Sequence, residues 1–138
     1  MKTTSTTAIE IGDELQPLAF PPISRTTLAL FAGASGDHNP MHIDIDFAKK
    51  AGADDVFAHG MLVMAYLGQL LTNWLPQERI RELGVRFTSV TQIHAQLTCT
   101  GKVVEKYEED GEERAKLSLQ VTDENGDVKI VGDAVVLL

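Results

Sequence analysis

The stretch HGMLVMAYLGQLLTNWLP, residues 59–76, is apolar on nearly every side between Met61 and Leu71. A helix that is apolar around its whole circumference is normally buried rather than amphipathic. The run is too short for a bilayer span, which needs about 20 apolar residues, and it ends near Pro76. The sequence therefore predicts a central core helix in this part of the chain.

Beyond residue 81 the apolar pattern changes to a period of two, which is typical of strands with one buried face. In AKLSLQV, residues 115–121, Leu117 and Leu119 alternate with polar side chains. The other segments of this kind are VRFTSV (85–90), AQLTCTGKV (95–103) and VKIVGDAVVLL (128–138). Asp110-Gly111 and Asn125-Gly126 are hairpin-turn signals between them. A buried helix followed by such strands predicts an α+β fold, in which an antiparallel meander wraps around the helix.

The composition indicates one globular domain over residues 1–138, with 43% hydrophobic side chains. The net charge of −8 argues against a nucleic-acid-binding surface. Cys99 is the single cysteine, so we expect neither an internal disulfide nor a multi-cysteine metal site. The first residues contain no apolar secretory segment. We therefore expect a cytoplasmic protein with no membrane partner.

The segment ISRTTLALFAGASG, residues 23–36, predicts a second helix with Ser24 as its N-cap. It runs into SGDHNPMH, residues 35–42, which holds a carboxylate, an amide and two histidines. Pro40 prevents a regular helix from continuing through this stretch. These polar groups are therefore expected on irregular backbone.

Asp37 and His42 would lie ~140° apart on a regular helix, but a bend at Asn39-Pro40 can bring them together. Held near one water, an Asp and a neutral His could polarise it and shuttle its protons. An ordinary polar turn with solvated side chains is an open alternative. A metal site is another, with the ligand set His38, His42, Asp44 and Asp46. Pro40 disfavours it, because His38 and His42 would need a helix between them to share a face.

His59-Gly60 directly precedes the predicted core helix. A helix N-terminus offers unpaired N–H groups and a positive dipole end, and a glycine lets a ligand carbonyl approach closely. Gly60 could therefore form an oxyanion-type site. His59 alone fits a capping or a core histidine equally.

The whole stretch FAGASGDHNPMHIDIDFAKKAGADDVFAHGMLVM, residues 31–64, resembles the hydratase motif of the MaoC-like (R)-specific enoyl-CoA hydratases and (3R)-hydroxyacyl-thioester dehydratases. Residues 11–33 and 83–104 are also similar to this family, and most similar to its single-domain bacterial elongation-dehydratase-type subunits. The resemblance implies a hot-dog fold, a curved antiparallel sheet around a long helix at about residues 60–74. It also implies a homodimer or dimer of dimers, or a heterodimer with another hot-dog subunit, with sheets joined edge to edge.

By motif position, the resemblance implies that Asp37 and His42 are the catalytic pair that holds a water. It implies that Asn39 supports the site by hydrogen bonding and that the Gly60 N–H binds the thioester carbonyl. The motif residues that would support this geometry without doing chemistry are Ser35, Gly36, Pro40 and His59. No metal or other cofactor is implied.

The activity implied by the resemblance is reversible hydration of a trans-2-enoyl thioester to a (3R)-3-hydroxyacyl thioester in fatty-acid or related acyl metabolism. The carrier, CoA or acyl carrier protein, stays open. Candidates to contact it, which could equally be ordinary surface charges, are Arg79, Arg81, Arg86 and Lys102. One alternative is a non-catalytic or obligate-heterodimer subunit that binds acyl thioesters. An acyl-CoA thioesterase is disfavoured, because residues 61–73 contain no Asp or Glu to direct water at the thioester carbon.

Overall fold

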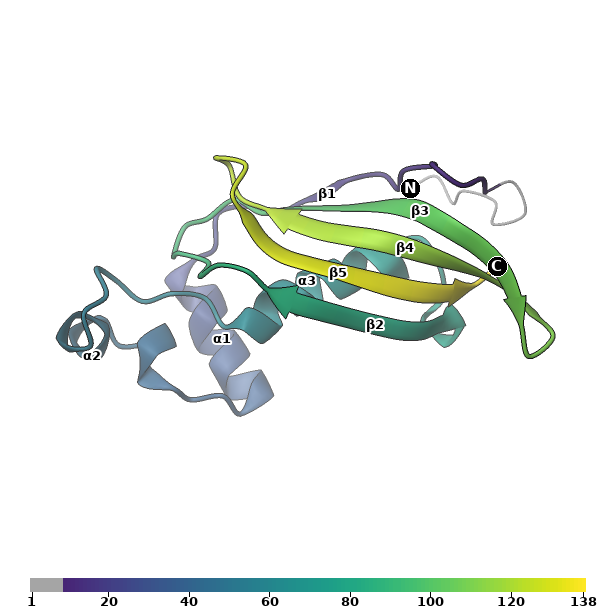
Figure 1. The fold of residues 1–138 in the computed structure, drawn as a ribbon. Coiled ribbons are helices and arrows are strands. Elements are labelled where there is room, and N and C mark those ends of the chain that lie inside the picture. Colours follow the sequence, from purple (N-terminus) through teal and green to yellow (C-terminus); the bar gives the residue numbers. More distant parts are fainter. Residues whose placement is uncertain (1–8) are drawn as a thin grey trace.

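A five-stranded antiparallel sheet curves over one long helix in the computed structural model, which describes residues 9–138 (Figure 1). The strands are β1 (Leu18–Ala19), β2 (Ile80–Phe87), β3 (Thr98–Glu109), β4 (Glu112–Thr122) and β5 (Val128–Leu137). The helices are α1 (Arg25–Ser35), α2 (Ile45–Lys50) and α3 (Gly60–Thr72), with short 3-10 turns η2 (Pro40–His42) and η3 (Gln77–Arg79). The predicted α+β class and central helix are therefore confirmed. The segment on which the expectation about secretion rests lies partly outside the described residues.

The strand order is β1-β3-β4-β5-β2. The predicted meander is correct for β3, β4 and β5, whose two hairpins turn at Asp110-Gly111 and near Gly126, all with positive φ. It is wrong for β2, which precedes β3 in the chain but pairs with β5 at the far edge. Residues 88–97 carry the chain from that edge to β3, near the opposite edge. A period of two identifies which face of a strand is buried but contains no information about its neighbours.

The core lies between α3 and the concave face of the sheet. Leu62, Leu67 and Leu71 of α3 are buried there with Leu117 and Val121 of β4. The alternation predicted for β4 is thus confirmed.

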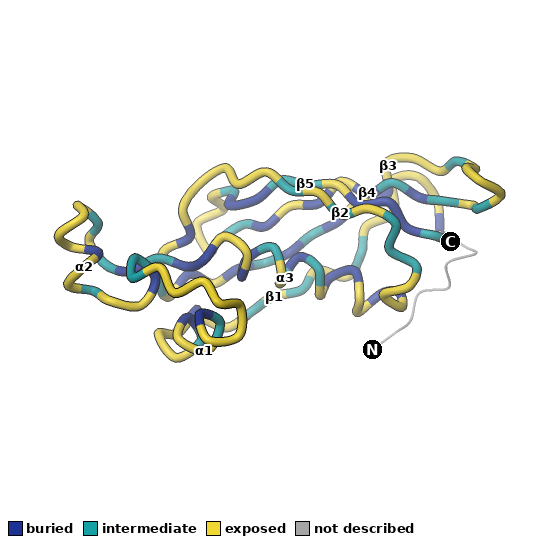
Figure 2. The backbone as a smooth tube through the Cα atoms, turned by 90° about the horizontal axis from the view of Figure 1, so that it is seen from below, coloured by how far each residue is buried: buried dark blue, intermediate teal, exposed yellow. Residues whose placement is uncertain are grey.

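The helix α3 is not buried on every side, contrary to the expectation from its composition. Met61 is 56% exposed, and Ala65, Gln69 and Thr72 are also exposed, at a spacing that places the four on one side of the helix as an exposed stripe. In Figure 2 the tube of α3 changes between buried and exposed colours along its length. The reason is that the sheet of this chain covers only one side of the helix. Within residues 9–138, no helix is both long and apolar enough to cross a bilayer.

The helix α1 begins and ends as its sequence predicts. The Ser24 hydroxyl accepts a hydrogen bond from the Thr27 N–H, which caps the first turn. At the other end Gly36 adopts a left-handed conformation with φ of 78° and donates to the Ala32 carbonyl. This glycine turns the chain out of the helix and into the polar stretch that follows.

Candidate active site

The polar stretch after α1 is held by successive side-chain to backbone hydrogen bonds. The Asp37 N–H donates to Ser35 Oγ at 3.1 Å, and the Asn39 N–H donates to Asp37 Oδ1 at 3.2 Å. The Asn39 side chain then accepts from the Met41 N–H at 3.1 Å and caps η2, which begins at Pro40. Such Asx-type turns fix irregular backbone. They leave Asp37 Oδ2 directed toward His42.

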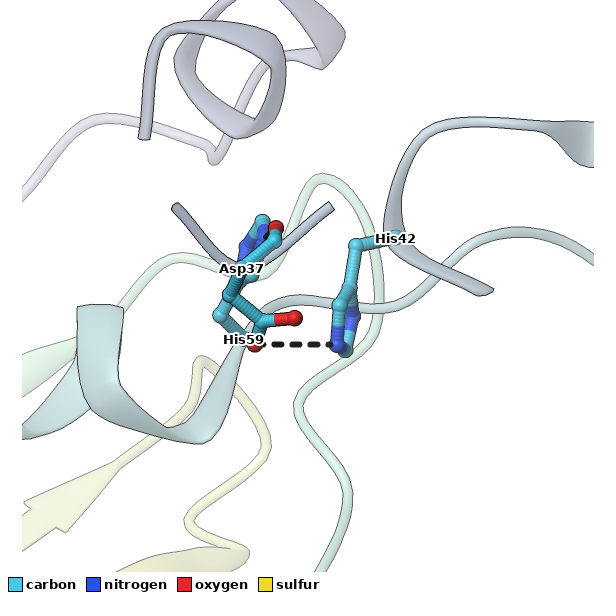
Figure 3. A group of neighbouring side chains, drawn as sticks. All are labelled: Asp37, His42 and His59. Carbon is cyan, nitrogen blue, oxygen red and sulfur yellow. Dashed lines mark hydrogen bonds and ion pairs between the residues drawn. The ribbon is translucent and has the colours of Figure 1, made fainter. Parts of the chain in front are cut away.

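His42 is almost buried, and its orientation is set by a backbone group. Its Nδ1 lies 2.7 Å from the Phe57 carbonyl oxygen. A carbonyl can only accept, so Nδ1 carries a proton, and in the neutral ring the lone pair is on Nε2. Nε2 lies 4.0 Å from Asp37 Oδ2 (Figure 3). This distance exceeds a hydrogen bond and suits a bridging water, so the bend places the two residues as the sequence predicted.

His59 lies beside this pair and is 1% exposed. Its Nε2 lies 3.2 Å from the Asp37 carbonyl oxygen, to which it donates, and its ring is 4.0 Å from the His42 ring, tilted by 30°. Burial, and secondarily the nearby His42, lower the pKa of His59 below its usual range. Although His59 precedes α3, its side chain does not cap the helix. The structure therefore supports a core histidine and not a capping one.

Gly60, the first residue of α3, borders a cavity of about 320 Å³ that His42 also lines. The ring of Phe87, from the end of β2, lies over Gly60. A Cβ atom added to the glycine would come 3.0 Å from Phe87 Cε1. The helix N-terminus, the aromatic ring and the histidine thus share one cavity.

The wall of this cavity formed by residues 88–91 was not anticipated from the sequence. Lys129 supports it, because its buried ammonium donates to the Val90 carbonyl at 3.0 Å and to Asp127 Oδ2 at 2.7 Å. Ser89 Oγ also donates to Asp127, at 3.0 Å. A lysine within a strand gives no local signal of such a role, because the contact depends on how β5 meets the end of β2.

Residues 6–125 match the sequence model of the family described as "MaoC like domain". The chain belongs to the MaoC-like family. It is 28% identical to the (R)-specific enoyl-CoA hydratase of Aeromonas caviae over 111 residues, which cover 80% of this chain and 83% of that protein. It is 32% identical over 72 residues to a mitochondrial 3-hydroxyacyl-[acyl-carrier-protein] dehydratase of Arabidopsis thaliana, a match that covers 52% of this chain and 42% of the plant protein.

The solved R-hydratase PhaJ1 of Pseudomonas aeruginosa, in its unliganded form, superposes with a TM-score of 0.84 at 26% identity. The match covers 95% of this chain and 83% of that one. The hot-dog arrangement expected of this MaoC-like chain is thereby confirmed.

Asp37, His42 and His59 each bring one nitrogen or carboxylate oxygen to within 4.8 Å of one another, close enough to share a water or an ion. Among the described residues of this MaoC-like protein, the metal set considered from the sequence does not come together, since the group formed contains neither Asp44 nor Asp46.

Of the four basic residues considered for contact with a carrier, Arg81 is already engaged. Its Nε and Nη2 donate to the two oxygens of Glu112 at 3.0 Å and 2.6 Å. This bidentate pair joins β2 to β4 and compensates the charge of Arg81, whereas Arg86 on β2 is exposed.

Proposed function

We propose that this protein catalyses the reversible hydration of a trans-2-enoyl thioester to the (3R)-3-hydroxyacyl thioester. The observation that carries the proposal is the 4.0 Å gap between Asp37 Oδ2 and His42 Nε2, beside a cavity that Gly60 borders. A carboxylate and a histidine lone pair facing one gap can hold a water between them. The activities named for the Aeromonas and Arabidopsis relatives support the same reaction.

In the hydration direction, Asp37 takes a proton from the water while the water oxygen forms a bond to C3. The electron pair of the C2–C3 double bond moves toward C2 and the thioester oxygen. His42 accepts a hydrogen bond from the water through Nε2 and orients it for attack. The proton that Asp37 has taken is then delivered to C2, which completes the addition and restores the Asp37 carboxylate. The Gly60 N–H stabilises the negative charge on the thioester oxygen, and one such donor contributes about 10²- to 10³-fold in rate.

The first test is Asp37→Asn, which keeps the shape of the side chain and removes the base. We expect hydration of crotonyl-CoA, followed by loss of its conjugated ultraviolet absorbance, to fall by about 10²- to 10⁴-fold. His38→Gln is the matched control, because His38 is exposed in the same turn. Near-full activity of Asp37→Asn, with both variants folded, would contradict the assignment.

Thioester hydrolysis is separated from hydration in the same samples. The helix α3 contains no acidic residue that could direct water at C1. A thiol reagent should therefore detect no release of free CoA while the enoyl absorbance disappears. Release of CoA without 3-hydroxyacyl product would favour a thioesterase.

We further propose that two copies of the chain join through β2, in a homodimer or in dimers of such dimers. The strand β2 forms one edge of the sheet and, within residues 9–138, pairs only with β5. The exposed stripe of α3 lies near it, since Ala65 and Gln69 border one groove with Ile80 and Leu83 of β2. A second copy would cover both the open edge and this stripe. Light scattering on the purified chain should give two or four times the mass of one chain, whereas activity that needs a different hot-dog chain would indicate a heterodimer.

A further inference from the structure

His59 is a core histidine, but burial alone does not explain why an imidazole stands at this position. It precedes α3 without capping it, and its Nδ1 is buried with no hydrogen-bond partner among the described residues. A buried polar atom without a partner is destabilising, and an apolar side chain at this position would avoid that cost. The imidazole must therefore contribute something that a leucine or a phenylalanine would not.

The contacts of His59 reach both members of the pair proposed to hold the water. Nε2 donates to the main-chain oxygen of Asp37, and the ring packs against the ring of His42, with centroids 4.0 Å apart and planes tilted by 30°. On another side, Phe31 of α1 packs edge-on, with ring centroids 4.9 Å apart. His59 is thus held in place by α1 while it contacts Asp37 and His42 from one side.

We propose that His59 is a positioning residue that sets the gap between Asp37 and His42. The inference rests on the proposed hydratase function. The hydrogen bond from Nε2 fixes the position of the turn that carries Asp37. The His59 ring limits rotation of the His42 side chain, because the two rings are packed together. His59 is not itself a proton donor to substrate, because its Nε2 proton is engaged by the Asp37 carbonyl.

The protonation state of His59 agrees with this role. Its pKa is lowered by burial and by His42, so the ring stays neutral beside a partner that handles protons. A charged His59 would repel a protonated His42 at a ring distance of 4.0 Å.

Two substitutions separate the two contacts. His59→Gln can still donate to the Asp37 carbonyl but offers no ring face to His42. His59→Phe keeps a ring face but cannot donate. We expect each to lower kcat on crotonyl-CoA by about 10- to 100-fold, because a displacement of ~1 Å in a reacting group costs on the order of 100-fold. KM should change little, and His38→Gln should match the parent.

A double-mutant cycle distinguishes positioning from general loss of structure. In an Asp37→Asn background, His59→Gln should lower kcat little further, since its effect is exerted through the group already removed. Full additivity, a loss confined to KM, or parental activity in both His59 variants would overturn the proposal. Melting curves identify any variant that does not fold, and such a variant is left out of the comparison.

Nitrogen NMR of the imidazole rings tests the proposal without an activity assay. In the parent protein, at a pH where both rings are neutral, we expect the His42 proton on Nδ1 and the His59 proton on Nε2. In His59→Gln, the nitrogen signals of His42 should show a mixture of tautomers or should broaden. A parent with the opposite tautomers, or a His42 spectrum unchanged in the variant, would overturn the role of His59. Absence of hydratase activity in the parent would instead refute the proposed function, and the NMR result would still decide this inference.

Discussion

Replacement of Gly60 by alanine should separate stability from activity. The backbone of Gly60 does not have positive φ, so alanine fits its conformation. The new Cβ would meet the Phe87 ring at 3.0 Å, 3.2 Å and 3.4 Å, which requires a shift of a few tenths of an ångström. Phe87 is 50% exposed and can make this shift at little cost.

Gly60→Ala should leave stability unchanged or raise it, and it should lower activity. A compatible Gly→Ala change stabilises by about 0.4–1 kcal/mol, largely through the unfolded chain, so the unfolding temperature should stay the same or rise by a few degrees. The methyl group would project into the cavity at the helix N-terminus, where we propose that the thioester oxygen binds. Displacement of that oxygen from its donor should lower kcat/KM by about 10²- to 10³-fold.

The assay is crotonyl-CoA hydration together with thermal unfolding of the same samples. Gly33→Ala in α1 is the matched control, because a Cβ there meets nothing within 4 Å. It should match Gly60→Ala in stability and the parent in activity. A folded Gly60→Ala protein whose kcat/KM stays within about threefold of the parent would refute the placement of the thioester oxygen at this helix terminus.

The remaining predictions concern the supports of the site. Lys129→Met should destabilise the protein by about 3 kcal/mol in urea unfolding, because it leaves the mostly buried Asp123 carboxylate without its cation. Asp127→Asn should lower the free energy of unfolding by less. Equal losses in the two variants would argue against this reasoning. The Arg25 guanidinium lowers the pKa of Asp55 from 3.8 to about 2 through a bidentate pair at 2.9 Å and 2.7 Å. Because the folded-state pKa is the lower one, this contribution to stability is complete above about pH 4 and is lost as the pH falls toward 2. Urea unfolding of the parent and Asp55→Asn should therefore differ at pH 6 and converge near pH 2, and a constant difference would contradict the pairing.

Features that depend on neighbours along the chain were predictable. The capped helix α1 follows from Ser24 and Gly36, and the hairpins follow from turns such as Asp110-Gly111. The approach of Asp37 to His42 also has a local cause, since the turn is built from side-chain to backbone bonds within a few residues.

Features that depend on contacts distant in sequence were not predictable. The pairing of β2 with β5 brings Phe87 onto Gly60 and sets Lys129 under Val90. None of these residues has a pattern that distinguishes it from other strand residues. The exposed stripe of α3 was missed for a related reason, because an all-apolar helix looks the same in sequence whether its own sheet or a second chain covers it.

The exposure of the Asp37 side chain and the exposure of β2 and α3 have a common explanation. The Asp37 side chain is 50% exposed, although His42 behind it is nearly buried. Electrostatic stabilisation of a developing charge is stronger where water is excluded. In a single chain, the exposure of Asp37 to solvent would therefore weaken catalysis by the Asp37–His42 pair. Met61 and Val90 are also half exposed, and Val90 lines the cavity beside Phe87. A second copy across β2 and α3 would cover these residues and enclose the site. Hydratase activity per chain should therefore fall on dilution below the dissociation constant of the dimer, while circular dichroism stays unchanged; constant specific activity in a demonstrated monomer would show that one chain suffices.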